Sequence, residues 1–230
     1  MITLRKANER GLTQTDWLES WHTFSFDTYY SPQHTHFRNL RVINQDVVAP
    51  GAGFGMHAHN NMEIITYVIR GTLTHKDSMG NEAAIRPGEI QIMSAGTGVQ
   101  HSEFNASQTE PVELLQIWIF PNEKSLVPSY QQKSFIKKEN ALTLLVDSAP
   151  TQSTVTIHQD IKLYVCKLSA GLTIDYEIMD KHYLWLQIIK GEFLIDTLSA
   201  SAGDGVAVNE QTKIKITAQQ DGELLLFVLS

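Results

Sequence analysis

Two short motifs of alternating metal-ligand residue types lie about 40 positions apart in this chain of 230 residues. The first contains His57 and His59, and the second contains His101 and Glu103. Residues i and i+2 of a β-strand project from the same face, so each motif would present two side chains together. Three imidazoles and one carboxylate from two facing strands would suit a divalent Fe, Mn, Ni, Cu or Zn ion and leave room for water or substrate. A metal site is therefore the leading hypothesis.

The segments that must position these residues are short strands separated by turns. Residues 40–48 and 62–69 are rich in residues that favour strands, and Gly or Pro turns follow them. Residues 72–86 have the pattern of a hairpin with its turn at 78–81. Many short strands at this spacing predict an all-β barrel or sandwich.

A change of composition predicts a division into two domains. Residues 121–140 are polar, charged and poor in strand-forming residues, and the strand pattern resumes after them. In both halves a strand ending in a basic residue and glycine leads into a hairpin, and a turn of glycine and an acidic residue follows. Two tandem copies of one barrel would explain this plan. We therefore expect a metal-binding domain at 1–130 and a domain without metal ligands at 131–230, since the second half has no HxH motif.

Composition narrows the functional classes. The net charge of −7 argues against a nucleic-acid-binding surface. The N-terminus lacks the apolar core of a signal peptide, and no apolar run approaches membrane-spanning length, so a cytoplasmic protein without membrane contacts is expected. The single cysteine, Cys166, excludes an internal disulfide and lies in an apolar run, where we expect it to be buried and unreactive.

The motifs and their surroundings resemble a known family. The pattern G(x)5HxH(x)3E, followed by PG(x)7G(x)4H, resembles the two motifs of the cupin superfamily. The segments SWHTFSFDTYY, GFGMHAHNNMEIITYVIRG and IMSAGTGVQHSEFN are similar to the pirin family, in particular to bacterial pirin-like quercetin 2,3-dioxygenases. The resemblance is strong over most of residues 1–130 and looser beyond. It implies an all-β bicupin in which only the N-terminal barrel holds metal.

The same resemblance implies a site and an activity. The ligands would be His57, His59, His101 and Glu103, and the ion one divalent transition metal, Fe2+ first, with Ni, Cu, Mn, Co or Zn as alternatives. The reaction would be ring cleavage of a flavonol such as quercetin by O2 with loss of one carbon, and Glu103 would also accept the substrate's hydroxyl proton. Glu63, the carboxylate of the first motif, is not usually a ligand in pirins. It could orient an imidazole or merely begin a strand.

Other functions stay open on sequence grounds. The chain could be a metal-dependent binding or regulatory module with a protein partner and little oxygenase turnover. The natural substrate could also be another small aromatic compound or an enol. Two barrels in one chain would already reproduce the pairing seen in a cupin dimer, which is compatible with a monomer.

The remaining histidine and aromatic residues are assigned to structure rather than to chemistry. His34 and His36 form a second HxH, but they lie beside a proline without a partner motif, which favours a surface loop. His75 is expected to face solvent, and His22 has no assigned role. Core packing is favoured for the aromatic residues Trp21, Phe24, Phe26, Trp118 and Trp185.

Overall fold

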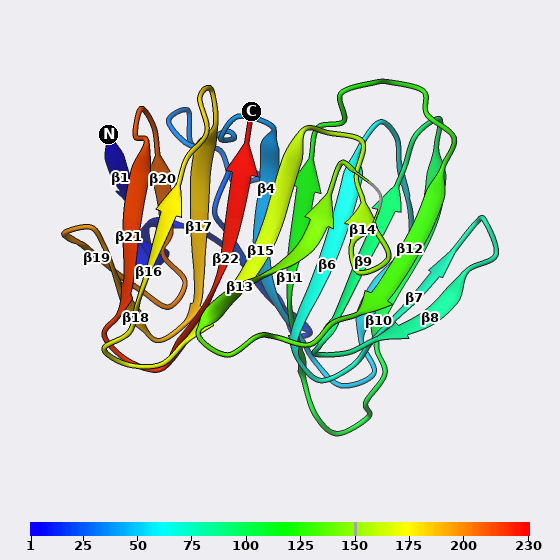
Figure 1. The fold of residues 1–230 in the computed structure, drawn as a ribbon. Coiled ribbons are helices and arrows are strands. Elements are labelled where there is room, and N and C mark those ends of the chain that lie inside the picture. The colour runs from blue at the N-terminus through cyan, green and yellow to red at the C-terminus, as the bar shows by residue number, and fades with distance from the viewer. Residues whose placement is uncertain (150) are drawn as a thin grey trace. The chain divides into compact units, whose positions relative to one another are not determined.

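The computed structural model describes residues 1–149 and 151–230 and confirms the all-β prediction (Figure 1). Within these residues the one helical element is the short 3-10 turn η1 (Ala7–Glu9). Contacts divide the chain into two compact units. The histidine unit comprises Gly11–Phe135 and Ser148–Gln159, and the C-terminal unit comprises Met1–Arg10, Ile136–Asp147 and Asp160–Ser230. The domain boundary expected at residue 130 stays a prediction, because it concerns which parts of the chain fold separately.

The histidine unit contains two antiparallel sheets. The larger has the strand order β12-β9-β6-β11-β4-β3-β2, and the smaller has the order β5-β10-β7-β8. The strands are β2 (Gly11–Gln14), β3 (Leu18–His22), β4 (Leu40–Val48), β5 (Gly53–His59), β6 (Glu63–Arg70), β7 (Leu73–Asp77), β8 (Glu82–Ile85), β9 (Glu89–Ser94), β10 (Val99–Asn105), β11 (Val112–Ile119) and β12 (Ser129–Ser134). The short β14 (Val155–Thr156) lies in the second segment of this unit.

The C-terminal unit repeats this plan. Its strands are β1 (Ile2–Arg5), β13 (Ala141–Asp147), β15 (Ile161–Leu168), β16 (Thr173–Glu177), β17 (Tyr183–Lys190), β18 (Glu192–Ile195), β19 (Leu198–Ser201), β20 (Gly205–Val208), β21 (Lys213–Ala218) and β22 (Gly222–Leu229). The order β20-β17-β22-β15 repeats β9-β6-β11-β4, and β16-β21-β18-β19 repeats β5-β10-β7-β8. The two units are therefore built on one strand topology.

The interiors of the two units differ in polarity. The strand pair β16 and β21 aligns Ile174 with Ile216 and Tyr176 with Ile214, and these side chains join one continuous apolar core. The described residues of the histidine unit include two smaller apolar clusters, one around Val68 and one around Met93. Buried polar side chains occur between such clusters only where hydrogen bonds or ligands offset their loss of water. The buried polar side chains of the histidine unit therefore indicate a functional site.

One strand lies where the sequence analysis expected a linker poor in β-structure. β12 pairs with β9 along its whole length, from Ser129 opposite Ser94 to Ser134 opposite Glu89. Its residues are mostly polar and half-buried, because it forms the edge of the larger sheet. Polar residues are common on edge strands, where they oppose association with other chains. The segment 121–140, whose composition is poor in strand-forming residues, therefore contains a strand.

Candidate metal centre

The four residues predicted to bind metal lie on two adjacent strands of the smaller sheet. His57 and His59 belong to β5, and His101 and Glu103 belong to β10. The antiparallel register places His101 directly opposite His57. The ring centroids of His57 and His101 are 4.4 Å apart, and that of His59 lies 4.8 Å from His57 and 4.9 Å from His101. One ring nitrogen from each of the three lies within 4.8 Å of the other two, so the imidazoles converge.

Glu103 lies beside His101, after a break in the strand register. Between His101 and Glu103 the pairing with β5 shifts, so that Glu103 is opposite Phe54. Such bulges re-aim side chains next to functional sites. The β5 backbone comes so close here that a Cβ atom on Gly53 would overlap the carbonyl oxygen of Glu103. Glycine is therefore required at position 53 for this approach.

Hydrogen bonds fix both oxygens of the Glu103 carboxylate. Gln116 Nε2 donates to Oε2 at 2.8 Å, and Thr66 Oγ1 donates to Oε1 at 3.3 Å. Each oxygen keeps a further lone pair, because a carboxylate oxygen can accept two bonds. The donor atoms of Glu103 and His101 form a second convergent group with His75, again within 4.8 Å. Glu103 is thus adjacent to the imidazole cluster and held by the facing sheet.

His75 is a site residue that the sequence analysis missed, and the expectation that it faces solvent was wrong. It is 1% exposed and lies opposite Glu103 in the pairing of β7 with β10. Its Nε2 is 3.0 Å from Oδ2 of the buried Asp77, while its Nδ1 has no hydrogen-bond partner. The signal was present in the sequence, because His75 and Asp77 alternate with Leu73 and so share its buried face.

The electrostatic setting keeps His59 and His101 neutral. Burial, with the neighbouring His57 and His59 as further causes, lowers the pKa of His101 to about 2. Burial also lowers the pKa of His59 to about 4, with His57 as a second cause. Burial raises the pKa of Glu103, against the effect of His75 and the two hydrogen bonds. Neutral imidazoles have the free lone pair that a metal requires.

The unpaired nitrogens of His101 test whether a metal fits. Both ring nitrogens of this buried side chain lack a hydrogen-bond partner. Buried polar atoms are nearly always paired, so an orphaned imidazole needs an explanation such as an absent ion. Three imidazoles with an adjacent carboxylate are the donor set of many divalent transition-metal sites. The residues present therefore fit a metal of this class.

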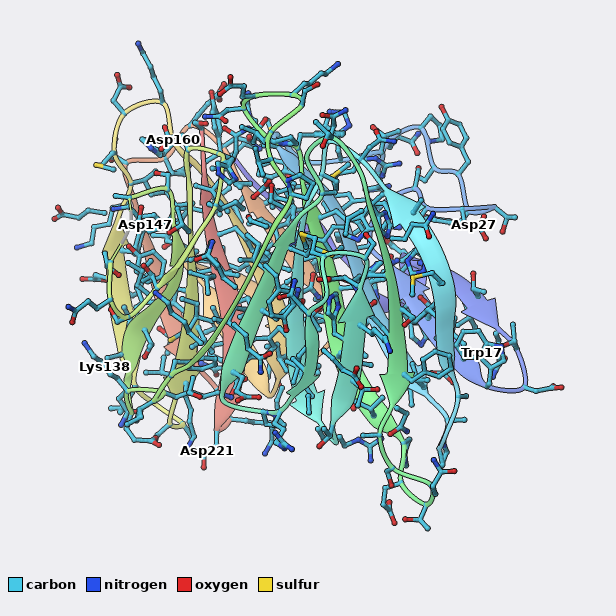
Figure 2. The ribbon with its side chains drawn as sticks, turned by 90° about the vertical axis from the view of Figure 1, so that its right-hand side faces the viewer. Trp17, Asp27, Lys138, Asp147, Asp160 and Asp221 are labelled. Atoms are coloured by element: carbon cyan, nitrogen blue, oxygen red, sulfur yellow. The ribbon has the colours of Figure 1, made fainter. Side chains whose placement is uncertain are left out.

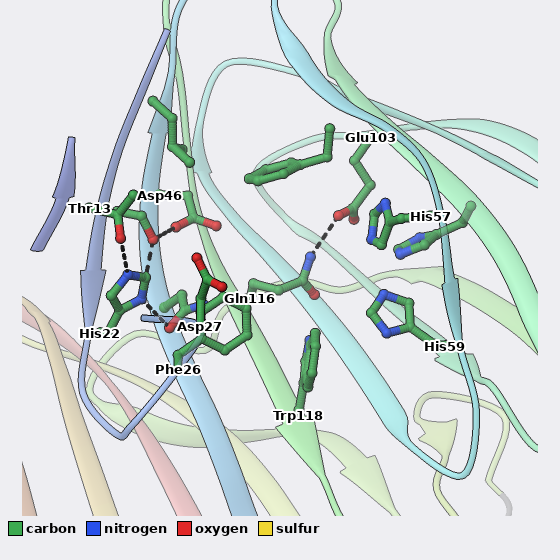
Figure 3. Close-up of a pocket in the computed structure, with 15 residues that line it drawn as sticks. Thr13, His22, Phe26, Asp27, Asp46, His57, His59, Glu103, Gln116 and Trp118 are labelled. Atoms are coloured by element: carbon green, nitrogen blue, oxygen red, sulfur yellow. Dashed lines mark hydrogen bonds between the residues drawn. The ribbon is translucent and has the colours of Figure 1, made fainter. Parts of the chain in front are cut away.

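A pocket opens beside the imidazoles (Figure 3). Its apolar lining includes Leu18, Phe26, Phe54 and Trp118. The Trp118 ring lies edge-on to His59, with centroids 4.9 Å apart, and edge-on to Phe26 at 5.4 Å. Pockets with apolar and aromatic walls and a few convergent polar groups are typical binding sites for small ligands.

Several aromatic residues expected in the core take other positions. Phe26 and Trp118 line the pocket, and Trp21 is half-exposed, where its Nε1 donates to Glu19 Oε1 at 2.9 Å. The buried face of β3 carries Leu18, Ser20 and His22 instead. Phe24 and Trp185 are buried, as expected.

A row of buried polar residues crosses the larger sheet beneath the pocket. In register, His22 is opposite Asn44, Asn44 is opposite Gln116, Gln116 is opposite Thr66, and Thr66 is opposite Gln91. Gln116 links this row to the imidazole cluster through its hydrogen bond to Glu103. The pattern could not be seen in the sequence, because its members come from five strands.

The remaining candidates lie outside the cluster. Glu63 is buried and faces His158, whose Nδ1 and backbone N–H are each 3.3 Å from Oε2, so it orients an imidazole other than the predicted ligands. His34 and His36 are in a segment without strands and contact Ser31 and Thr35, as expected for a loop. Cys166 is buried and free, and burial raises its pKa to about 12.

A side-chain view of the molecule locates two residues of the histidine unit. Trp17 and Asp27 lie at the outer edge of the histidine unit (Figure 2). Asp27 is exposed and lines the pocket, so the pocket reaches the surface there. Within its described part the chain has no helix that could cross a membrane.

Comparison with known proteins identifies relatives over the full length. The Pirin family profile matches residues 4–119, and the quercetinase C-terminal cupin domain matches residues 144–229. Over 229 residues the chain is 46% identical to quercetin 2,3-dioxygenase of Escherichia coli, with 100% of this chain and 99% of that protein covered.

Solved structures agree with these matches. The crystal structure of YhhW from Escherichia coli has a TM-score of 0.98 at 46% identity and covers 100% of this chain and 98% of its own. The structure of the bacterial pirin YhhW in complex with nickel(II) has a TM-score of 0.96 at 45% identity, with 100% and 99% covered. The predicted fold of two tandem cupin domains is confirmed.

Proposed function

This chain belongs to the pirin family of cupin proteins, and from that membership we propose that it is a metal-dependent quercetin 2,3-dioxygenase. The observation that carries the proposal is the convergence of His57, His59 and His101 at one side of a pocket with aromatic walls, with the Glu103 carboxylate in a second group that shares His101. The substrate would be a flavonol such as quercetin, and O2 would open its ring with loss of one carbon. The name of the relative at 46% identity supports the same activity.

The metal would be bound by His57, His59 and His101, with Glu103 as the fourth ligand. The nickel(II) complex of YhhW supports a divalent ion, and Fe2+ remains our first candidate. When bound, the ion would polarise the substrate's hydroxyl and carbonyl oxygens and lower the hydroxyl pKa. His75 shares the second group with Glu103 and binds Asp77 through its Nε2, but it is not one of the four ligands in this proposal.

The protein's own residues then perform the proton transfer and positioning. Glu103, whose carboxylate converges with His101, accepts the hydroxyl proton of the flavonol. Gln116 and Thr66 hold its two oxygens and so keep it at the edge of the pocket. Trp118 and Phe54 pack on the faces of the aromatic substrate and exclude water from the anion that reacts with O2.

The cellular setting is part of the same proposal. A net charge of −7 and a single buried cysteine support action in the cytoplasm without nucleic acid or membrane contacts. Two units of one topology in a single chain support a monomer.

The test is oxygen uptake together with loss of quercetin absorbance in protein of measured metal content. Wild type should turn over with about one metal per chain, whereas His57→Ala should lose both metal and activity. His36→Ala is the matched control, because it removes a histidine from an HxH that lies in a loop. Full metal content without turnover of any flavonol would refute the dioxygenase and favour a metal-dependent binding module.

A further inference from the structure

The pocket has a second polar wall formed by the strands β2, β3 and β4. Figure 3 shows Thr13, His22 and Asp46 on the side of the pocket opposite His57 and Glu103. Asp46 is 3% exposed and His22 is 2% exposed. None of the wall residues belongs to the convergent groups described above. The proposed metal ligands therefore do not explain why polar residues are buried in this wall.

Hydrogen bonds hold the wall rigid. His22 Nδ1 is 2.9 Å from Asn44 Oδ1, an acceptor, so Nδ1 carries the proton. Its Nε2 then accepts a hydrogen bond from Thr13 Oγ1 at 2.8 Å. Ser20 Oγ, which lies 3.5 Å from His22 Nδ1, donates to Asp46 Oδ1. The orientation of the Asp46 carboxylate is thus set by Ser20.

The second oxygen of Asp46 has no such partner. Ser20 provides the one side-chain hydrogen bond that Asp46 makes with the described residues, and it goes to Oδ1. Oδ2 is left as an acceptor on a side chain that lines the pocket. Burial raises the pKa of Asp46 to about 7, so this environment is unfavourable for a bare charge. Oδ2 is not among the buried side-chain atoms that lack a partner, so it is open to the pocket, where a ligand can donate a hydrogen bond to it.

We propose that Asp46 is a specificity-determining residue. It accepts a hydrogen bond from a phenolic hydroxyl of the substrate on the side of the pocket opposite the imidazoles (Figure 3). The pocket thereby selects flavonols that carry such a hydroxyl in addition to the hydroxyl and carbonyl groups that face the imidazoles. This inference rests on the proposed function for its substrate class. Its physical basis is the pairing of a carboxylate oxygen that faces the pocket with a donor that only a polyhydroxylated ligand brings.

The binding of two flavonols distinguishes contacts with Asp46 from contacts with the imidazoles. Quercetin carries hydroxyls on its outer rings, whereas 3-hydroxyflavone keeps only the hydroxyl and carbonyl proposed to face the metal. Binding to metal-loaded protein is measured without oxygen, by quenching of tryptophan fluorescence, and turnover is measured separately in air. Asp46→Asn, which keeps the shape of the side chain, should weaken quercetin binding about tenfold or more and leave 3-hydroxyflavone unchanged. Ser20→Ala should act in the same direction, because it releases the carboxylate.

Glu19→Gln is the matched control, since Glu19 lies on the same strand but pairs with the half-exposed Trp21. It should change neither affinity, and all variants should keep their metal content and a cooperative unfolding transition. Equal effects of Asp46→Asn on both flavonols, or no effect on either, would overturn the proposal. If wild type binds quercetin in an Asp46-dependent way yet turns over neither compound, the subsite stands and the dioxygenase fails. If it binds neither compound, both are overturned.

Discussion

Replacement of His101 by alanine should remove the stabilisation that metal gives to the protein. His101 is 1% exposed, belongs to both convergent groups, and lies 4.4 and 4.9 Å from the rings of His57 and His59. His101→Ala would therefore leave His57, His59 and Glu103, which do not belong to one convergent group without His101. Without metal the change should be modest, because lost packing is offset by the removal of two unpaired buried nitrogens.

The size of the effect follows from linkage. An ion present at 100 times its dissociation constant adds about 2.7 kcal/mol to the free energy of unfolding. In a chain of this length 1 kcal/mol shifts the melting temperature by about 2–4 °C, so metal should raise it by about 5–10 °C in wild type. His101→Ala should show a shift near zero.

The assay is thermal unfolding followed by tryptophan fluorescence, in chelator and then in excess divalent metal. His36→Ala serves as the control and should keep the full metal-induced shift, because His36 lies outside both groups. If His101→Ala retained stoichiometric metal and the wild-type shift, the assignment of His101 as a ligand would be refuted.

Three further experiments test the role of Glu103, the close approach of β5 to β10 and the burial of Cys166. Glu103→Gln should lower kcat at least about 100-fold while metal content by elemental analysis is retained; loss of metal in parallel would assign Glu103 to binding alone. Gly53→Ala should destabilise the protein by about 1–3 kcal/mol in urea unfolding, whereas Gly55→Ala, with no atom within 4 Å of the added Cβ, should not; equal effects would contradict the close approach of β5 to β10. Burial keeps the Cys166 thiol protonated at neutral pH, so it should react with a disulfide reagent only in denaturant; rapid labelling of the folded protein would show that it is accessible.

The parts of the site that the sequence predicted are those encoded by local alternation. His57 and His59, like His101 and Glu103, are two residues apart, so the geometry of one strand brings each pair together. The strands β4 and β6 could be predicted for the same reason, because their β-branched composition is local.

The parts that could not be predicted depend on strand register. His75 meets Glu103 only because β7 and β10 pair with these residues opposite each other. Asp46 and Ser20 are likewise brought together by the pairing of β3 with β4. Isolated polar residues in otherwise apolar strands could have marked both, since a buried polar residue is retained where a partner or ligand binds it. β12 could not be found because a polar edge strand has no apolar alternation.

The most direct test of the proposed activity is the fate of dioxygen. Metal-loaded wild type is incubated with quercetin under isotopically heavy dioxygen, and the product is analysed by mass spectrometry. A ring-opened product that contains label from dioxygen, formed in proportion to the oxygen consumed, is the predicted result. Unchanged quercetin, or a product without label, in protein with full metal occupancy would contradict it.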